Sequence, residues 1–147
     1  MIVVDASLAA KWILWEDQSA EALHFLKAFQ SELCAPDLIL VEVAGAVTRI
    51  ARMANIADDD SERLLSWWFG DFGLAAVDLR RPSRDIVREA ARISIALSHP
   101  IQDCLYLAMA DDLDADLVTC DGKFHRKAVD TYPRVKLLSD YRRMSSR

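Results

Sequence analysis

The sequence predicts a three-layer α/β fold, in which a central parallel sheet of four to five short strands lies between layers of helices. Short apolar runs, often β-branched, alternate along the chain with longer segments whose apolar residues recur at helical spacing. The clearest short run, Ile2-Val3-Val4, is continuously apolar, as is typical of parallel strands buried on both faces. No linker rich in Gly, Pro or Ser divides the 147 residues, so residues 1–147 are predicted to form one domain.

Five segments fit the strands of this sheet. The first is 2–4, which ends at the polar residue Asp5. The others are expected at 33–35, 74–77 and 117–119, with 135–138 as a final edge strand.

The helices are expected between these strands, where apolar stripes meet residues typical of helix ends. Ser19 gives a partial N-cap signal, the acids 58–60 are expected to cap a helix, and Pro82-Ser83 opens another. His99-Pro100 interrupts the chain before a helix that is apolar on every face. The predicted helices cover about 6–15, 16–29, 38–53, 58–72, 82–97, 101–113 and 122–128.

Composition argues for a cytoplasmic globular protein. No apolar run approaches the roughly 18 residues that cross a bilayer, and no basic segment precedes an apolar one at the N-terminus. Cys34, Cys104 and Cys120 form no CxxC pair, so we expect free thiols in a reducing compartment.

Charge is unevenly distributed along the chain. The net charge of −5 argues weakly against nucleic acid, yet residues 1–79 carry 5 basic and 13 acidic side chains, whereas residues 80–147 carry 13 basic and 10 acidic ones. Solvated helix faces or phosphate contacts would both explain the basic groups of the second part. These groups are Arg80, Arg81, Arg84, Arg88 and Arg92, followed by Lys123, Arg126 and Lys127.

Four acidic residues stand where the predicted topology can bring them together. Asp5 ends the first strand, Asp121 follows the fourth, and Asp103 lies in the first turn of the helix before that strand. Glu42 lies near the start of the helix after the second strand, within an apolar run that predicts a buried carboxylate with a partner. Because ligands gather at the carboxyl ends of parallel strands, the four acids are expected at one edge of the sheet.

Each acid also has a plainer explanation. Asp5 and Asp103 could cap the helices that they precede or open, Asp121 could be a turn residue before Gly122, and Glu42 could be an exposed helix residue. As a set they are harder to dismiss, because clustered carboxylates repel one another unless a hard cation lies between them. Mg²⁺ and Mn²⁺ prefer oxygen ligands, and they can activate a water for attack on a phosphodiester. Zinc is not expected, because the chain has no His pair at i, i+4 and no paired Cys.

The adjacent aromatic residues Trp67, Trp68 and Phe69 cannot all face one side of a helix, since neighbours are about 100° apart. At least one is expected to be exposed or covered by a partner, in a partner groove or a dimer contact. Trp12 and Trp15 could likewise belong to the core or face a partner.

Four segments carry a resemblance to a known family. They are Val3-Val4-Asp5-Ala6-Ser7, Ala35-Pro36-Asp37-Leu38 with Glu42-Val43, the run from Asp103 to Ala110, and the run from Ala115 to Phe124. In these segments, which together span nearly the whole sequence, the chain resembles the PIN-domain ribonucleases, specifically the VapC-type toxins of bacterial toxin–antitoxin pairs. The resemblance implies a PIN-like fold and Mg²⁺- or Mn²⁺-dependent cleavage of RNA, often one structured RNA such as a tRNA. It also implies a homodimer that is inhibited by a cognate VapB-type antitoxin.

The resemblance further implies roles for individual residues. Asp5, Asp103 and Asp121 would hold the metal, and Glu42 would orient or deprotonate the attacking water. Ser7 and Thr119 would be supporting hydroxyls, unless they only cap local structure. Candidate phosphate contacts are Lys11, Arg80, Arg81 and Lys123.

One position departs from the family pattern. Gly45 stands where many members have Asn, three residues after the second acid. A mid-helix Gly costs about 1 kcal/mol relative to Ala, so close helix packing is expected to explain it.

Two other enzyme or signalling classes fit less well. A haloacid-dehalogenase-type phosphatase needs a second Asp two residues after the first, where this chain has Ser7. A receiver domain needs an acidic pair after its first strand and a Lys after its last, and neither is found. A PIN fold without catalysis, which only binds RNA or protein, is the main alternative.

Overall fold

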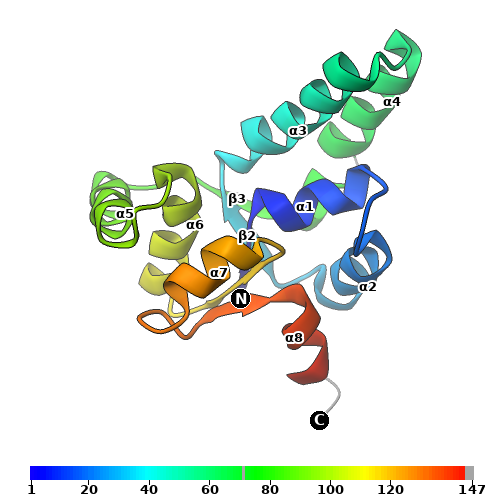
Figure 1. Ribbon diagram of the computed structural model, residues 1–147. Coiled ribbons are helices and arrows are strands. Elements are labelled where there is room, and N and C mark those ends of the chain that lie inside the picture. Colours follow the sequence, from blue (N-terminus) through cyan, green and yellow to red (C-terminus); the bar gives the residue numbers. More distant parts are fainter. Residues whose placement is uncertain (71, 145–147) are drawn as a thin grey trace.

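The computed structural model describes residues 1–70 and 72–144, and it has the predicted layered architecture (Figure 1). Five parallel strands form one sheet in the order β3-β2-β1-β4-β5. The strands are β1 (Ile2–Val4), β2 (Leu33–Pro36), β3 (Asp78–Arg80), β4 (Asp116–Thr119) and β5 (Val135–Leu137).

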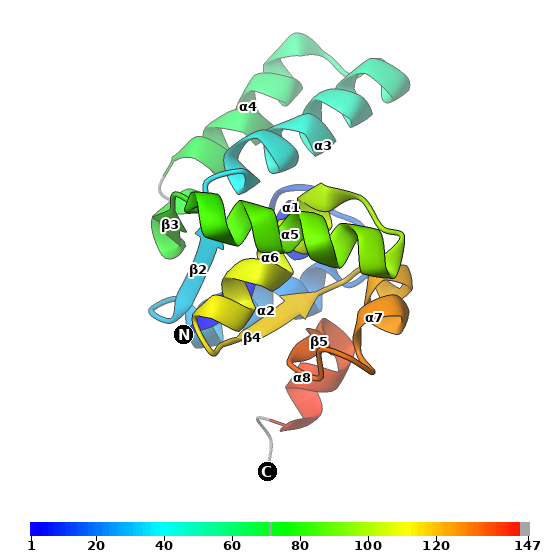
Figure 2. The ribbon, with the colours of Figure 1, turned by 90° about the vertical axis from the view of Figure 1, so that its left-hand side faces the viewer.

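Helices cover both faces of the sheet. Figures 1 and 2 show α5, α6 and α7 on one side of the strands and α1, α2 and α8 on the other, as right-handed crossovers require. The helices are α1 (Ala6–Ile13), α2 (Ser19–Phe29), α3 (Ile39–Ala54), α4 (Asp58–Phe69), α5 (Arg84–Leu97), α6 (Ile101–Asp112), α7 (Gly122–Ala128) and α8 (Leu138–Met144). The pair α3 and α4 forms a hairpin that projects beyond the sheet and packs on α1.

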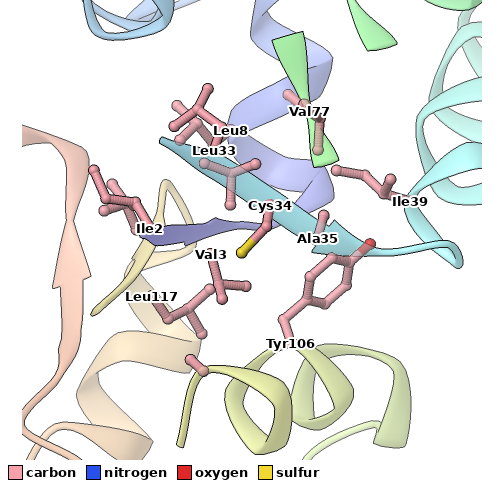
Figure 3. Close-up of a cluster of buried hydrophobic side chains, with 14 of the residues drawn as sticks. Ile2, Val3, Leu8, Leu33, Cys34, Ala35, Ile39, Val77, Tyr106 and Leu117 are labelled. Carbon is pink, nitrogen blue, oxygen red and sulfur yellow. The ribbon is translucent and has the colours of Figure 1, made fainter. Parts of the chain in front are cut away.

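The core lies where α6 crosses the central strands. Val3, Leu117 and Tyr106 are fully buried there, and Figure 3 shows the Tyr106 ring beside the strand residues. Because α6 is buried along Cys104–Ala110, its first turn is held firmly against the ends of β1, β2 and β4. The core therefore fixes the place of Asp103.

The chain order creates a switch point between β1 and β4. From β1 the chain moves outward to β2 and β3, and it then returns to the other side of β1 to form β4. The crossovers that leave β1 and enter β4 lie on opposite faces, which leaves a crevice at the carboxyl ends of these two strands. Asp5 follows β1 directly at this point, and Asp121 lies two residues after the end of β4.

The prediction for the third strand was wrong. Residues Leu74–Ala76 form a 3₁₀ turn, and the strand begins two residues after it at Asp78. Since β3 is an edge strand, Asp78 and Leu79 are exposed and carry little apolar signal, whereas Val77 is buried beneath the turn. The apolar run that predicted a strand therefore belongs to the turn before it.

Several helix ends also differ from the prediction. Helix α1 ends at Ile13 and α4 at Phe69, and α8 occupies a segment where no helix was expected; the predicted end of α4 at 72 spans residue 71, outside the described residues. The acids 58–60 occupy the first turn of α4, while Ala57 takes the cap position. Gln18, not Ser19, occupies the N-cap position of α2 and makes no side-chain capping hydrogen bond. The Ser19 hydroxyl instead donates to the Leu14 carbonyl and accepts from the Glu16 amide.

No helix within the described ranges is both long and apolar enough to cross a membrane.

Candidate acidic site

The carboxylate of Asp5 is held by three donors at the end of β1. Its Oδ1 accepts from the Ser7 hydroxyl at 2.7 Å and from the Leu8 amide at 3.1 Å, and its Oδ2 accepts from the Thr119 hydroxyl. Asp5 thereby also caps α1. Each hydroxyl uses its single proton in the hydrogen bond to Asp5, so it can only accept from other donors. Ser7 accepts from the Cys120 amide and Thr119 from the Asp121 amide, each at 3.0 Å. This network joins the ends of β1 and β4.

Burial makes the charge of Asp5 costly. The side chain is only 4% exposed, and this burial raises the pKa of Asp5 to about 6 despite the three hydrogen bonds that favour its ionised form. The charge of Asp103 nearby raises the pKa further. A positive charge near both carboxylates would relieve this cost.

Glu42 is half-buried in the first turn of α3 and has a partner, as its apolar surroundings predicted. The Tyr106 hydroxyl donates to Glu42 Oε1 at 2.7 Å across 64 positions of sequence. Burial, together with the charge of Asp103, raises the pKa of Glu42, although the Tyr106 hydrogen bond opposes this shift. Glu42 is therefore electrostatically linked to Asp103.

His99 is a close neighbour of Asp103, and the sequence analysis did not predict it as a site residue. His99 Nε2 lies 2.6 Å from Asp103 Oδ2, one helical turn away in sequence. Ligand atoms of His99, Asp103 and Asp121 all lie within 4.8 Å of one another, and Asp5 is not part of this compact group. Asp103 is thus linked to all of these groups: its charge acts on Asp5 and Glu42, and its carboxylate belongs to one compact group with His99 and Asp121.

Asp121 and Asp103 differ in their local roles. Asp121 caps α7 and accepts from the Phe124 amide at 3.0 Å, so the plainer turn explanation also describes its geometry. Asp103 caps nothing, because Pro100 takes the cap position of α6. A capping role therefore does not explain the carboxylate of Asp103.

A cleft of about 540 Å³ opens beside these acids, between α1 and α3. Ser7, Glu42, Asp103 and Cys120 line its acidic end, whereas Asp5 and Asp121 are not among its lining residues. The two cations of its lining are Lys11, from α1, and Arg49, which lies two helical turns after Glu42 on α3. Glu16 also lines the cleft and forms an ion pair with Lys11, so the cleft combines an acidic end with one ion-paired cation and a second cation, Arg49.

Of the four candidate phosphate contacts, Lys11 alone lines this cleft. Its ammonium is 3.2 Å from Glu16 Oε1 and donates to the Asp17 carbonyl at 2.8 Å. Arg80 lies at the end of β3 and pairs with Asp78 at 3.1 Å, while Arg81 and Lys123 are exposed. The cleft cation Arg49 was missed by the sequence analysis, because no charge cluster surrounds it.

The aromatic group on α4 divides as expected. Trp68 is fully buried and donates from Nε1 to the Leu40 carbonyl at 3.2 Å, whereas Trp67 and Phe69 are 47% and 53% exposed. Trp12 is buried and Trp15 is exposed. An apolar hollow of about 580 Å³ lies beside them, lined by Lys11, Trp12, Ile13, Trp15, Leu23, Trp67 and Phe72.

The explanation expected for Gly45 was wrong. A Cβ atom at this position would meet no other atom within 4 Å, so no close helix contact requires glycine here. The structure offers no packing reason for this residue.

The acidic site fits a hard divalent cation. Its side chains offer carboxylate oxygens as ligands. Two of these carboxylates, the buried Asp5 and the half-buried Glu42, have pKa values that are raised by burial and by the neighbouring carboxylate of Asp103. Such mutual destabilisation is what a cation with oxygen ligands removes.

Comparison with known proteins gives matches over most of the chain. The family model described as PIN domain matches residues 2–130. Ribonuclease VapC3 of Pyrobaculum aerophilum is 25% identical over 126 residues, which cover 86% of this chain and 93% of that protein. Ribonuclease VapC12 of Mycobacterium tuberculosis is 27% identical over 124 residues, covering 84% of this chain and 88% of that protein.

Solved structures show the same fold at lower identity. A crystal structure of PAE2754 from Pyrobaculum aerophilum superimposes with a TM-score of 0.68 at 16% identity, covering 99% of this chain and 97% of that one. A toxin–antitoxin complex from Klebsiella pneumoniae contains a chain with a TM-score of 0.65 at 16% identity, covering 94% and 98%.

Proposed function

The chain belongs to the PIN domain family, and from that premise we propose that it is a metal-dependent endoribonuclease, the toxin of a toxin–antitoxin pair. The observation that carries the proposal is the position of Asp103 at the acidic end of the cleft, electrostatically linked to both Asp5 and Glu42. The ribonuclease names of its relatives VapC3 and VapC12 support the same activity. The substrate we propose is a structured RNA such as a tRNA.

The residues that would hold Mg²⁺ or Mn²⁺ are Asp103 and Asp121, with Asp5 directly or through water. When bound, the ion would lower the pKa of a water and stabilise negative charge on the leaving oxygen. Asp5 is kept ionised and oriented by the Ser7 and Thr119 hydroxyls, which are themselves fixed by backbone amides at the end of β4. The supporting hydroxyls thus set the geometry of the first acid.

Glu42 would accept a proton from the attacking water. Its Oε1 is engaged by Tyr106, which leaves Oε2 for a second contact in the cleft. The raised pKa of Glu42 makes it a better proton acceptor than an exposed carboxylate, because basicity rises with pKa.

The partners we propose are a second copy of the chain and a VapB-type antitoxin. The apolar hollow beside Trp15 and Trp67 supports a protein partner, because two large aromatic side chains are exposed there, Trp15 just after α1 and Trp67 on α4. The toxin–antitoxin complex from Klebsiella pneumoniae, whose fold this chain shares, supports an antitoxin as one such partner. Light scattering of the chain alone and with the antitoxin would test both assemblies.

The decisive experiment is an RNA cleavage assay on a mixed RNA pool that includes bulk tRNA. Wild type and Asp103→Asn are compared with Mg²⁺, with Mn²⁺ and with EDTA. Asp112→Asn serves as the matched control, because this acid lies on the same helix at its exposed far end. Discrete products are expected from wild type and Asp112→Asn, and none with EDTA or from Asp103→Asn.

Two outcomes would contradict the proposal. Equal cleavage by Asp103→Asn would rule out the acidic site as the source of activity. RNA binding without cleavage under every metal condition would instead favour the alternative, a PIN fold that acts only as a binding module.

A further inference from the structure

His99 is a buried polar residue that the proposed mechanism has not used. It is 8% exposed, and its ring stacks on Phe124 with centroids 4.8 Å apart and an interplanar angle of 28°. The turn that carries it is fixed from two sides, because the Ser94 hydroxyl donates to its carbonyl at 2.6 Å and Lys127 donates to the Ser98 carbonyl at 2.8 Å. The ring is therefore held in one orientation by packing and by its backbone.

The hydrogen-bond partners of the ring define its tautomer. Lys127 Nζ lies 3.3 Å from His99 Nδ1, and an ammonium group can only donate, so Nδ1 must accept. The proton of the neutral ring is then on Nε2, which donates to Asp103 Oδ2 at 2.6 Å. The direction of donation runs from Lys127 to His99 to Asp103.

We propose that Lys127 and His99 form a positioning relay that holds Asp103 Oδ2 and so aims Oδ1 at the cation in the cleft. The relay rests on the function proposed above and adds two residues to it. Hydrogen bonds from the surroundings to metal-binding carboxylates commonly tune metal affinity by 10- to 100-fold. Asp103 needs such an anchor more than Asp5 and Asp121, because its side chain caps no helix.

The rival role for His99 is direct metal binding, since its ligand atom lies within 4.8 Å of those of Asp103 and Asp121. A ring nitrogen that carries a proton has no lone pair for a metal, and Lys127 places that proton on Nε2, the atom that faces Asp103. The geometry therefore assigns His99 to the relay and not to the ligand set.

The tautomer can be observed directly by ¹⁵N NMR of the histidine ring nitrogens. The chain has 3 His, and the His99 signals are assigned by their loss in His99→Gln. A protonated Nε2 and an unprotonated Nδ1 are expected, with and without Mg²⁺. A proton on Nδ1, or loss of the Nε2 proton on addition of Mg²⁺, would overturn the relay whether or not the protein cleaves RNA.

The effect on the cation site is measured as Mn²⁺ affinity by electron paramagnetic resonance, without RNA. His99→Leu fills the space of the ring but removes the hydrogen bond, so a 10- to 100-fold loss of affinity is expected. His99→Gln retains an N–H donor near the position of Nε2, and it should keep affinity within a few-fold of wild type. Circular dichroism melts confirm that both variants are folded, and equal affinities for all three proteins would contradict the relay.

Substitution of Lys127 gives a test in which the direction of the change in Mn²⁺ affinity decides between two explanations. Removing a positive charge near a cation site should by Coulomb's law alone strengthen Mn²⁺ binding. The relay predicts the opposite for Lys127→Met, which is weaker binding because the ring loses the partner that fixes its tautomer. Lys27→Met, an exposed lysine on α2, controls for the loss of one charge.

The controls separate the relay from the proposed function. No Mn²⁺ binding by wild type would contradict the function, and the NMR measurement would still decide the tautomer. Binding that is lost in Asp103→Asn but unchanged in His99→Leu would uphold the cation site and overturn the relay.

Discussion

Asp5 has the most buried carboxylate of the candidate site, and its raised pKa of about 6 makes stability depend on pH. Between its ordinary pKa of 3.8 and 6, the folded chain binds a proton at Asp5 that the unfolded chain does not. For this group the free energy of unfolding therefore rises as pH falls from 7 to 5, by about 1 kcal/mol, in metal-free protein.

Urea denaturation in EDTA at both pH values tests this expectation. In Asp5→Asn, which removes the titrating group, the change from pH 7 to 5 should be about 1 kcal/mol less favourable than in wild type. Mg²⁺ should reduce the difference in the wild type, because a cation keeps Asp5 ionised. The same pH dependence in both proteins would contradict the assigned shift.

Gly45 and Gly73 are predicted to respond oppositely to alanine. A Cβ at Gly45 meets open space, so Gly45→Ala should stabilise the chain by about 1 kcal/mol through helix propensity. A Cβ at Gly73 would lie 2.7 Å from the Trp68 ring and 3.0 Å from the Trp68 carbonyl oxygen, so Gly73→Ala should be destabilising. Thermal unfolding of both variants measures the contrast, and a destabilised Gly45→Ala would point to a contact that the structure does not contain.

The acidic residues could be found from the sequence because their positions relative to strand and helix ends are local properties. Asp5, Asp103 and Asp121 each stand beside an apolar run that marks an element. The residues that complete the site could not be found in this way. From the sequence His99 was expected to interrupt a helix and Tyr106 to lie in an apolar helix, and Arg49 carried no signal. Their places in the site depend on contacts between different elements.

At the scale of elements, α4 is attached to the rest of the hairpin through Trp68. This residue is fully buried and hydrogen-bonded to the Leu40 carbonyl, while its neighbour Trp67 is about half exposed. Trp68→Ala should therefore cost about 3 to 5 kcal/mol of stability, whereas Trp67→Ala should cost little.

Chemical denaturation distinguishes the two tryptophans, and it also determines how a partner surface on α4 should be tested. Loss of antitoxin binding in Trp68→Ala would report on folding, so Trp67→Ala with Trp15→Ala is the informative combination. Similar losses of stability for Trp67→Ala and Trp68→Ala would contradict the packing of α4.

The elements that the sequence misplaced lie at the edges of the sheet. Central strands β1 and β4 are buried on both faces and are recognisable as apolar runs, but β3 and β5 lie at the edges and alternate with polar residues. Pairing with β2 places Leu79 opposite Ala35, and this register depends on the fold and not on the local pattern of residues 78–80. Helix α8 follows β5 without an intervening turn, which is why its first residue was assigned to the strand.

At the scale of the whole molecule, an excess of acidic residues in 1–79 must be reconciled with the proposed RNA substrate. The cleft suggests how, because its lining includes the cations Lys11 and Arg49 beside its carboxylates. Lys11 is engaged by Glu16, whereas Arg49 makes no ion pair with any residue that the structure describes. Arg49 is thus available to contact a phosphate of the proposed RNA substrate.

Arg49→Ala is therefore predicted to weaken RNA binding without changing the cation site. The probe is fluorescently labelled bulk tRNA, with both proteins carrying Asp103→Asn so that the RNA stays intact. One lost phosphate contact should reduce the slope of log affinity against log salt concentration by about 1. Arg63→Ala is the matched control, since Arg63 is an exposed arginine on the other helix of the hairpin. If the two variants kept the same salt dependence, RNA would not enter along the α3 wall, and the exposed cations Arg81 and Lys123 would become the next positions to test.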